Sequence, residues 1–358
     1  MGLLPPGSEA TVDVPFEKID QLKFAYDHLQ QPIKLFTGDQ LPDWLILDFA
    51  PHWAVEIGQE YGVPLVFFSV FSAATMSILG SPEHLSGADN RNHVLPSHQQ
   101  AKFLAMRSCN EFEGEYLEVC QKINGKPVIP TGFLPPEKPS AKREISSDDG
   151  SSNNVIFDWL DKQKPKSVVF VGFGSECKLS KEQVFEIAHG LELSELPFLW
   201  ALRKLNWANS EADALPPGFV ERTSDKGLVC LGWVPQMEIL GHPSVGGSLF
   251  HSGWGSVIET LQIGHVLVVL PFIIDQPLNA RLLVEKDLAV EVKRTEDGSF
   301  CKDDIAKTLR HAMVAEEGEK LRNNARKAAK VFGDHKLHQD DLGQFVHYLK
   351  NNVTRRSF

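Results

Sequence analysis

Apolar residues form two kinds of segment along this chain. Short runs rich in β-branched and aromatic residues alternate with longer stretches in which apolar residues recur at helical spacing. This alternation is typical of α/β folds with parallel sheets. Strands are predicted over residues 44–49, 64–69, 102–107, 127–131, 167–173, 198–202, 228–231, 247–250, 266–270 and 290–292. Helices are predicted over 52–61, 71–79, 111–123, a stretch from about Ser180, 256–262, 276–288, 302–332 and 335–351.

The pattern breaks once, between residues 135 and 154, where polar, turn-forming residues replace the apolar periodicity. We interpret 135–154 as a linker between a first domain, 1–134, and a second, 155–334. Residues 335–358 are expected to form a helix that packs back toward the first domain. A doubly wound sheet normally has about five or six strands. The first domain offers only four predicted strands after a Pro/Gly-rich opening, so we expect an incomplete Rossmann-like domain.

Composition and charge exclude several classes of protein. With 358 residues, 42% hydrophobic residues and a formal charge of −11, the sequence predicts a folded protein without the basic face of a nucleic-acid binder. No apolar run is long enough to span a membrane, and the opening residues lack the pattern of a signal peptide. The five cysteines are widely spaced, which favours free thiols over disulfides or a zinc site. We therefore expect a cytoplasmic monomer.

Residues suited to ligand binding or catalysis are concentrated in one stretch, 233–279. His251 follows a predicted strand, where open α/β sheets bind ligands, and Ser256 opens a helix whose free N–H groups suit a phosphate. Glu259 lies one turn further, where a carboxylate can accept both hydroxyls of a ribose, and Trp233 offers a flat face to a base.

Asp275 and Gln276 follow another predicted strand and precede a helix, so they belong to the same edge of the sheet and can bind sugar hydroxyls. Together these residues predict a nucleotide-sugar pocket. The alternative, a structural set of α/β turns with accidental polar residues, requires many positions to coincide by chance.

The stretch from Trp233 to about Asn279 resembles the donor-binding signature of the plant secondary-product UDP-glycosyltransferases of family 1. The segments 43–53 and 107–113 are also similar to that family, and the likeness is greatest to the branch that extends existing glycosides, which includes rhamnosyltransferases. The resemblance implies a GT-B fold of two Rossmann-like domains, here with the N-terminal one incomplete.

The resemblance also implies roles for individual residues in the nucleoside half of the donor site. Trp233 would stack on the uracil, the backbone of Val234 would pair with the edge of the base, and Gln236 would lie near the ribose. Glu259 would hold the ribose hydroxyls.

For the diphosphate, the implied ligands are His251 and Ser256, helped by Ser175 in the glycine loop after the first strand of the second domain. Gly253 and Gly255 flank this site. Most members of the family carry Asn where this chain has Gly255, so only a backbone amide is present there.

Trp254, Asp275 and Gln276 would contact the transferred sugar. The family uses the UDP-sugar as a co-substrate, with no cofactor and no metal ion. The acceptor would be a small lipophilic molecule, a flavonoid, a terpenoid or one of their glycosides.

The resemblance implies an inverting displacement in which an N-terminal histidine deprotonates the acceptor hydroxyl and an aspartate orients that histidine. Asp48 matches the aspartate, whereas the histidine belongs to a part of the family pattern that lies before the first residue of this chain. The alternative for Asp48 is to cap the following turn, and His52 is a weak candidate for a substitute base.

Two functions follow from these observations. The first is a UDP-glycosyltransferase, and the second is a non-catalytic UDP-sugar binder that lacks the general base. A nicotinamide-dependent dehydrogenase has little support because the chain lacks a complete G-x-G-x-x-G after an early strand.

Overall fold

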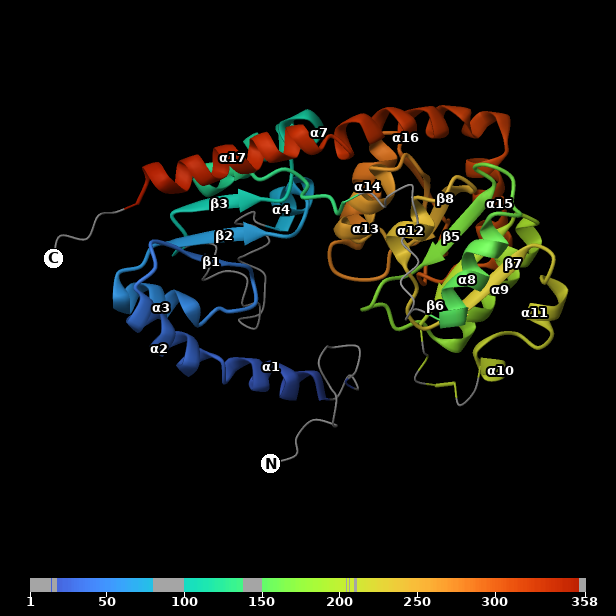
Figure 1. Ribbon diagram of the computed structural model, residues 1–358, viewed down its shortest axis with the longest axis horizontal. Helices are drawn as coiled ribbons and strands as arrows, with labels where there is room; N and C mark the ends of the chain where they lie inside the picture. Colours follow the sequence, from blue (N-terminus) through green and yellow to red (C-terminus); the bar gives the residue numbers. More distant parts are fainter. Residues whose placement is uncertain are drawn as a thin grey trace. The chain divides into compact units, whose positions relative to one another are not determined.

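The computed structural model describes residues 14, 18–79, 100–137, 150–203, 205, 207, 208 and 211–353. The chain forms two compact units, the first made of residues 1–134 and 335–358 and the second of residues 135–334 (Figure 1). Each unit is built on its own parallel β-sheet, as expected of an α/β fold with Rossmann-like domains.

Unit 1 contains a four-stranded parallel sheet in the order β1-β2-β3-β4. Its buried strands coincide with the apolar runs that predicted them, although β1 is shorter than the predicted 44–49. Two helices that the sequence pattern did not predict, α1 and α2, precede the sheet. The strands are β1 (Leu45–Leu47), β2 (Leu65–Ser69), β3 (Phe103–Met106) and β4 (Val128–Pro130). The helices are α1 (Ile19–Asp27), α2 (Gln30–Gln40), α3 (Ala54–Tyr61), α4 (Ala73–Leu79), α7 (Asn110–Asn124) and α17 (His335–Asn351).

The helix α17 belongs to unit 1 although unit 2 separates it in sequence from the other elements of that unit. Figure 1 shows α17 running alongside the sheet. Phe345 packs in a cluster with buried residues of β2 and β3, including Phe103. The indole N–H of Trp44 donates to the Leu349 carbonyl at 3.2 Å. These contacts make α17 one wall of the unit 1 core.

Unit 2 contains a six-stranded parallel sheet in the order β10-β9-β8-β5-β6-β7. Helices lie between the strands along the chain, as the pattern predicted. The strands are β5 (Val168–Gly172), β6 (Phe198–Leu202), β7 (Gly227–Leu231), β8 (Val245–Phe250), β9 (Val266–Val269) and β10 (Ala289–Glu291). The helices are α8 (Gly150–Leu160), α9 (Lys181–Ser194), α10 (Glu211–Ala214), α11 (Phe219–Arg222), α12 (Gln236–Leu240), α13 (Trp254–Leu261), α14 (Gln276–Glu285), α15 (Lys302–Met313), a 3₁₀ turn η3 (Glu316–Gly318) and α16 (Glu319–Phe332).

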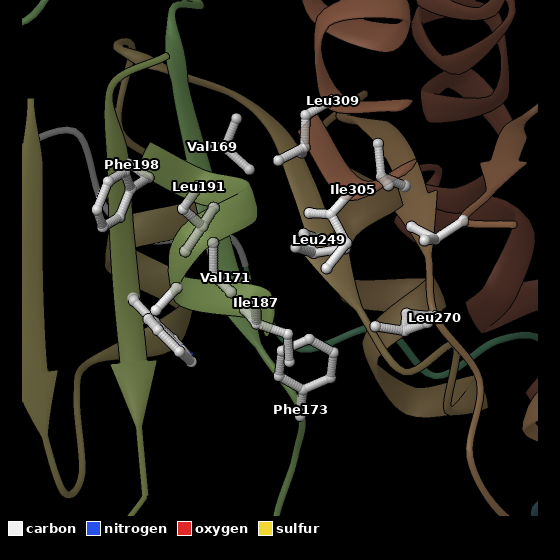
Figure 2. Packing of buried hydrophobic residues seen from close by; sticks show 14 of the residues in the cluster. Val169, Val171, Phe173, Ile187, Leu191, Phe198, Leu249, Leu270, Ile305 and Leu309 are labelled. Atoms are coloured by element: carbon white, nitrogen blue, oxygen red, sulfur yellow. The ribbon is translucent and has the colours of Figure 1, made fainter. Parts of the chain in front are cut away.

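Both faces of the unit 2 sheet are buried. On one face, Val169 and Val171 of β5 pack in a cluster with Ile187 and Leu191 of α9 and with Leu309 of α15 (Figure 2). On the other face, the alternate β5 residues pack against α8 and α12 in a second cluster. Strands buried on both sides read as continuous apolar runs, which is why their positions could be predicted.

Among the boundaries that differ from the prediction, those of α8, α13 and the predicted 302–332 helix bear most on the fold and the site. Helix α8 begins at Gly150, inside the predicted linker, because small polar residues there lead directly into an apolar helical segment. The predicted 302–332 helix is divided at η3 into α15 and α16. Helix α13 begins at Trp254 rather than at Ser256, so Ser256 lies in its first turn.

Within the described ranges, none of the helices has the length and apolarity to cross a membrane. The same residues contain no group of three or more His, Cys, Asp or Glu side chains arranged to hold a metal ion. All five cysteines are free, which confirms the prediction from their spacing.

Asp341 on α17 generates a stability prediction. Its Oδ2 is buried and has no hydrogen-bond partner among the residues described, and burial together with the nearby Glu111 and Asp340 carboxylates raises its pKa to about 6. Because the folded pKa lies above that of the unfolded chain, unit 1 loses stability as pH rises from about 4 through 6. We expect Asp341→Asn to stabilise the protein at pH 8 by about 1 kcal/mol, after allowance for solvent screening.

Urea denaturation at pH 5 and pH 8 measures this effect, with Asp39→Asn, an exposed carboxylate on α2 of the same unit, as the matched control. A variant Asp341→Asn that is less stable than the wild type at pH 8 would contradict the prediction.

The buried His265 leads to a second stability prediction, in which stability falls as pH is lowered rather than raised. The ring is fully buried between the Ser248 hydroxyl at 3.0 Å and the Leu240 carbonyl at 2.9 Å, and burial lowers its pKa to about 3. His265 therefore binds a proton near pH 6.5 in the unfolded chain but stays neutral in the folded protein down to about pH 3. Unit 2 loses stability as pH falls from 6.5 toward 3 because of this difference. We expect His265→Gln to reduce the loss between pH 6.5 and 5 by about 1–2 kcal/mol, measured by urea denaturation. An unchanged pH slope in the variant would show that His265 does not carry the effect.

Candidate functional site

The topology of unit 2 defines a switch point between β5 and β8. The chain runs outward from β5 through β6 to β7 and then returns to β8, which pairs with the opposite side of β5. It continues from β8 through β9 to β10 in the other direction. The loops at the carboxyl ends of strands flanking such a point form the usual ligand crevice of an open α/β sheet. All predicted donor residues lie in the loops that follow β5, β7, β8 and β9 or in the helices that begin after those loops.

His251 lies at this switch point, directly after β8, against two glycines. Gly174 has a φ of +69°, and a Cβ built on it would lie 2.8 Å from Cε1 of His251. A Cβ on Gly253 would lie 2.6 Å from Nε2. Both distances are too short for a real side chain, so the glycines are needed for the imidazole to occupy this position.

The imidazole of His251 is held in its neutral form. Burial lowers its pKa to about 4, and a hydrogen bond with the Gly172 backbone only partly opposes that effect. Nδ1 is buried and has no partner with hydrogen-bond geometry in the described part of the chain. A neutral imidazole carries one N–H donor and one nitrogen acceptor, so its other nitrogen, Nε2, is the one suited to a hydrogen bond with a ligand.

The N-terminus of α13 follows His251 at once. Gly253 is the N-cap, with no side chain to cap the helix. The first N–H groups of a helix have no intrahelical acceptor. One of them, on Trp254, is paired with the Asp275 carboxylate. The next two belong to Gly255 and Ser256, and this end of the helix dipole favours an anion.

Gln236 and Glu259 come together from different helices. Gln236 is the first residue of α12 and Glu259 lies in α13, and the Gln236 amide donates to Glu259 Oε2 at 2.6 Å. A carboxylate has about four acceptor sites, so this bond leaves capacity for ligand hydroxyls.

Trp233 follows β7 and is the most exposed large apolar side chain described, at 87%. Gly232 before it has a φ of +97°, and the next side chain, Val234, is buried. The Arg203 guanidinium carbon lies 5.7 Å from the centroid of the Trp233 ring. An exposed indole anchored by a buried neighbour can stack on a planar ligand.

Asp275 and Gln276 begin α14 and are both held by specific bonds. Burial raises the pKa of Asp275, whose carboxylate accepts from the Asn279 amide at 2.7 Å. Gln276 Oε1 accepts from the backbone N–H groups of Phe272 and Ile273 at 2.9 and 3.0 Å. Its Nε2 faces the Cys177 sulfur at 3.7 Å.

The remaining candidates occupy less constrained positions. Ser175 is exposed in the loop after β5. Asp48 belongs to unit 1, directly after β1, where its Oδ1 accepts from the Ala50 N–H at 2.8 Å. This bond is the turn-capping arrangement that the sequence offered as one alternative.

Sequence reasoning missed three residues that organise the loops: Ser252, Cys177 and the role of Asn279. Ser252 is fully buried with a φ of +60°, and Asn279 is fully buried beside it. The spacing of Asn279, four residues after Asp275 on a predicted helix, was the signal that could have found it.

Comparisons with known proteins identify the family of this chain. Residues 152–348 match the profile of the family described as UDP-glucoronosyl and UDP-glucosyl transferase. The chain is 38% identical to soyasaponin III rhamnosyltransferase of Glycine max, over 97% of this chain and 81% of that protein.

Two solved structures share the fold. The structure of Arabidopsis thaliana UGT89C1 complexed with UDP-L-rhamnose has 27% identity and a TM-score of 0.79, over 98% of this chain and 83% of that one. The structure of Glycyrrhiza uralensis UGT73P12 complexed with glycyrrhetinic acid 3-O-monoglucuronide has 24% identity and a TM-score of 0.84, over 97% and 82%. The fold is therefore GT-B. The chain belongs to the plant UDP-glycosyltransferases, which transfer a sugar from a UDP-sugar to an acceptor.

Proposed function

We propose that the loops at the carboxyl edge of the unit 2 sheet bind UDP-sugar, with separate groups of residues for the nucleoside, the diphosphate and the transferred sugar. The observation that carries the proposal is the 2.6 Å bond between Gln236 and Glu259, next to a helix start with no side-chain cap. In this arrangement Trp233 stacks on the base, and Glu259 accepts the ribose hydroxyls. His251 and the first turn of α13 bind the diphosphate, with Ser175 contributing its hydroxyl from the neighbouring loop.

The transferred sugar lies beside Trp254, Asp275 and Gln276 in this proposal. Two backbone amides occupy the oxygen of Gln276, so it can only donate, through the N–H of Nε2 that does not face Cys177. Asp275 offers a carboxylate acceptor. One relative is named a rhamnosyltransferase, and one solved neighbour holds UDP-L-rhamnose. These likenesses support a hexose or deoxyhexose donor.

The chemistry is a single displacement at the anomeric carbon. The acceptor oxygen forms the new C–O bond from the face opposite UDP, while the bond to the diphosphate breaks and its electron pair leaves with UDP. The configuration inverts, and the hydroxyl proton passes to a base. The helix N-terminus and the neutral His251 stabilise the leaving group without a metal ion.

On the acceptor side, Asp48 is the candidate carboxylate for orienting the base. The acceptor is a small lipophilic molecule or its glycoside, of flavonoid or terpenoid type, and the protein acts as a cytoplasmic monomer. The neighbour that holds glycyrrhetinic acid 3-O-monoglucuronide supports an acceptor of this kind.

The second candidate function is a UDP-sugar binder without turnover. The observation that favours it is the bond from the Ala50 N–H to Asp48, because this contact gives Asp48 a structural role that requires no catalysis. Donor binding is common to both functions, so only turnover separates them.

The role of Glu259 predicts a loss of donor affinity. Glu259→Gln keeps the shape of the side chain but removes its charge, and charge-assisted hydrogen bonds are about twice as strong as neutral ones. We expect the Kd for UDP, measured by titration calorimetry, to rise by about tenfold or more. Glu238→Gln, an exposed change on α12, serves as the matched control. Equal affinities in the wild type and Glu259→Gln would remove Glu259 from the site.

Turnover is tested by UDP release with several UDP-sugars and a panel of flavonoid and terpenoid glycosides. We expect release that depends on the acceptor, survives excess EDTA and yields product of inverted anomeric configuration by NMR. Asp48→Asn should lower the rate by about 10²-fold or more, because general acid–base machinery contributes about 10²–10⁴-fold. Asp43→Asn, an exposed change before the same strand, should not. UDP binding without turnover for any pair would establish the binder instead.

A further inference from the structure

Asn279 ties together two loops of the proposed donor site. Its side chain is fully buried. The Nδ2 group donates to the Ser252 carbonyl at 3.0 Å and to Asp275 Oδ2 at 2.7 Å. An amide NH₂ has two hydrogens, so these two bonds use both. Asn279 thus joins the segment after β8 to the first turn of α14.

The segment that Asn279 holds has an uncommon backbone conformation. Ser252 has a φ of +60°, in the left-handed region that is costly for residues other than glycine, and its neighbours must maintain it. The Ser252 hydroxyl donates to the Gln276 carbonyl at 2.9 Å. Both of these contacts come from the start of α14, so α14 fixes the backbone between His251 and Gly253.

The same bonds orient Asp275. Its carboxylate accepts from the Asn279 amide and from the backbone N–H of Trp254, the first residue of α13. Without the Asn279 donor, the carboxylate loses one of the bonds that aim it at the start of α13. Asn279 therefore acts on both sides of the sugar–diphosphate region without being exposed to a ligand.

We propose that Asn279 is a positioning residue for donor binding: it holds His251 and the N-terminus of α13 at a fixed separation from Asp275 and Gln276. The inference rests on the proposed function of this site. A site whose groups must meet a ligand at several points loses affinity when the groups are displaced by a fraction of an ångström. Asn279 thus affects UDP binding through the residues it bonds.

Asn279→Asp tests the proposal because it preserves shape and replaces the donor NH₂ with a carboxylate. At pH 8 the new carboxylate repels Asp275 and gives no bond to Ser252. Two adjacent carboxyls share a proton as pH falls, which restores a donor between positions 275 and 279. We expect the Kd of Asn279→Asp for UDP to be at least ten times the wild-type Kd at pH 8. The ratio of the variant's Kd to the wild-type Kd should be at least threefold smaller at pH 6 than at pH 8. Asn279→Ala has no such group, and its ratio should stay constant.

The matched control is Asn324→Asp, a change at a partly buried amide of unit 2, whose side chain donates to the Asp287 carbonyl at 3.2 Å. It should bind UDP as the wild type does at both pH values. Melting temperatures of all variants verify that each is folded where affinity is measured.

Three results would overturn the inference. Asn279→Asp and Asn279→Ala could melt earlier yet bind UDP with wild-type affinity, which would leave Asn279 a purely structural role. Asn279→Asp could bind weakly with no recovery at pH 6 beyond that of Asn279→Ala, in which case the donor to Asp275 is not what matters. A wild-type protein that does not bind UDP would reject the proposed function and this inference with it, whereas the first two results leave the proposed function intact.

Discussion

The adjacency of β5 and β8 is the constraint on which the candidate site depends. Because both strands are parallel and Gly172 is in register with Phe250, the residues that follow them, Gly174 and His251, arrive at the same edge of the sheet. The imidazole fits there only because Gly174 and Gly253 have no side chains. Core clusters on both faces keep the strands in this register, so the position of His251 is set by the packing of the whole sheet.

In the proposed binding mode, the donor meets dipoles and neutral groups rather than cations. Among the candidate donor residues the ionisable side chains are two acids, Glu259 and Asp275, and a histidine that burial keeps neutral. An anionic diphosphate in such a place is stabilised by backbone N–H groups and by the dipole of α13, in a protein whose formal charge is −11. Short-range contacts of this kind depend on exact geometry more than long-range attraction does, because they weaken steeply with distance and angle. This dependence gives the bonds of Asn279 their importance.

Sequence reasoning predicted most strands because strands buried on both faces are continuous apolar runs, as in β5 and β9. The alternation of strands and helices predicted the α/β class. The family was predicted because most of the donor-site residues fall in one continuous stretch, 233–279. The strand order could not be predicted, since no local pattern shows that β8 returns to the far side of β5. Helices α1 and α2 were missed because their apolar residues do not form a clean stripe, and Phe24, Leu35 and Phe36 remain exposed. The role of Asn279 was missed because its partners become visible only when two loops meet.

Unit 1 depends on contacts between residues that are very distant in sequence. Trp44 donates to the carbonyl of Leu349, 305 residues later, and Phe345 packs with residues of β2 and β3. Contacts of such sequence separation carry a high entropic cost of loop closure, which a folded unit 2 reduces by shortening the connection. During synthesis, α17 is also produced after all of unit 2. The core of unit 1 is therefore completed last, and β2 and β3 lack one of their covering helices until then.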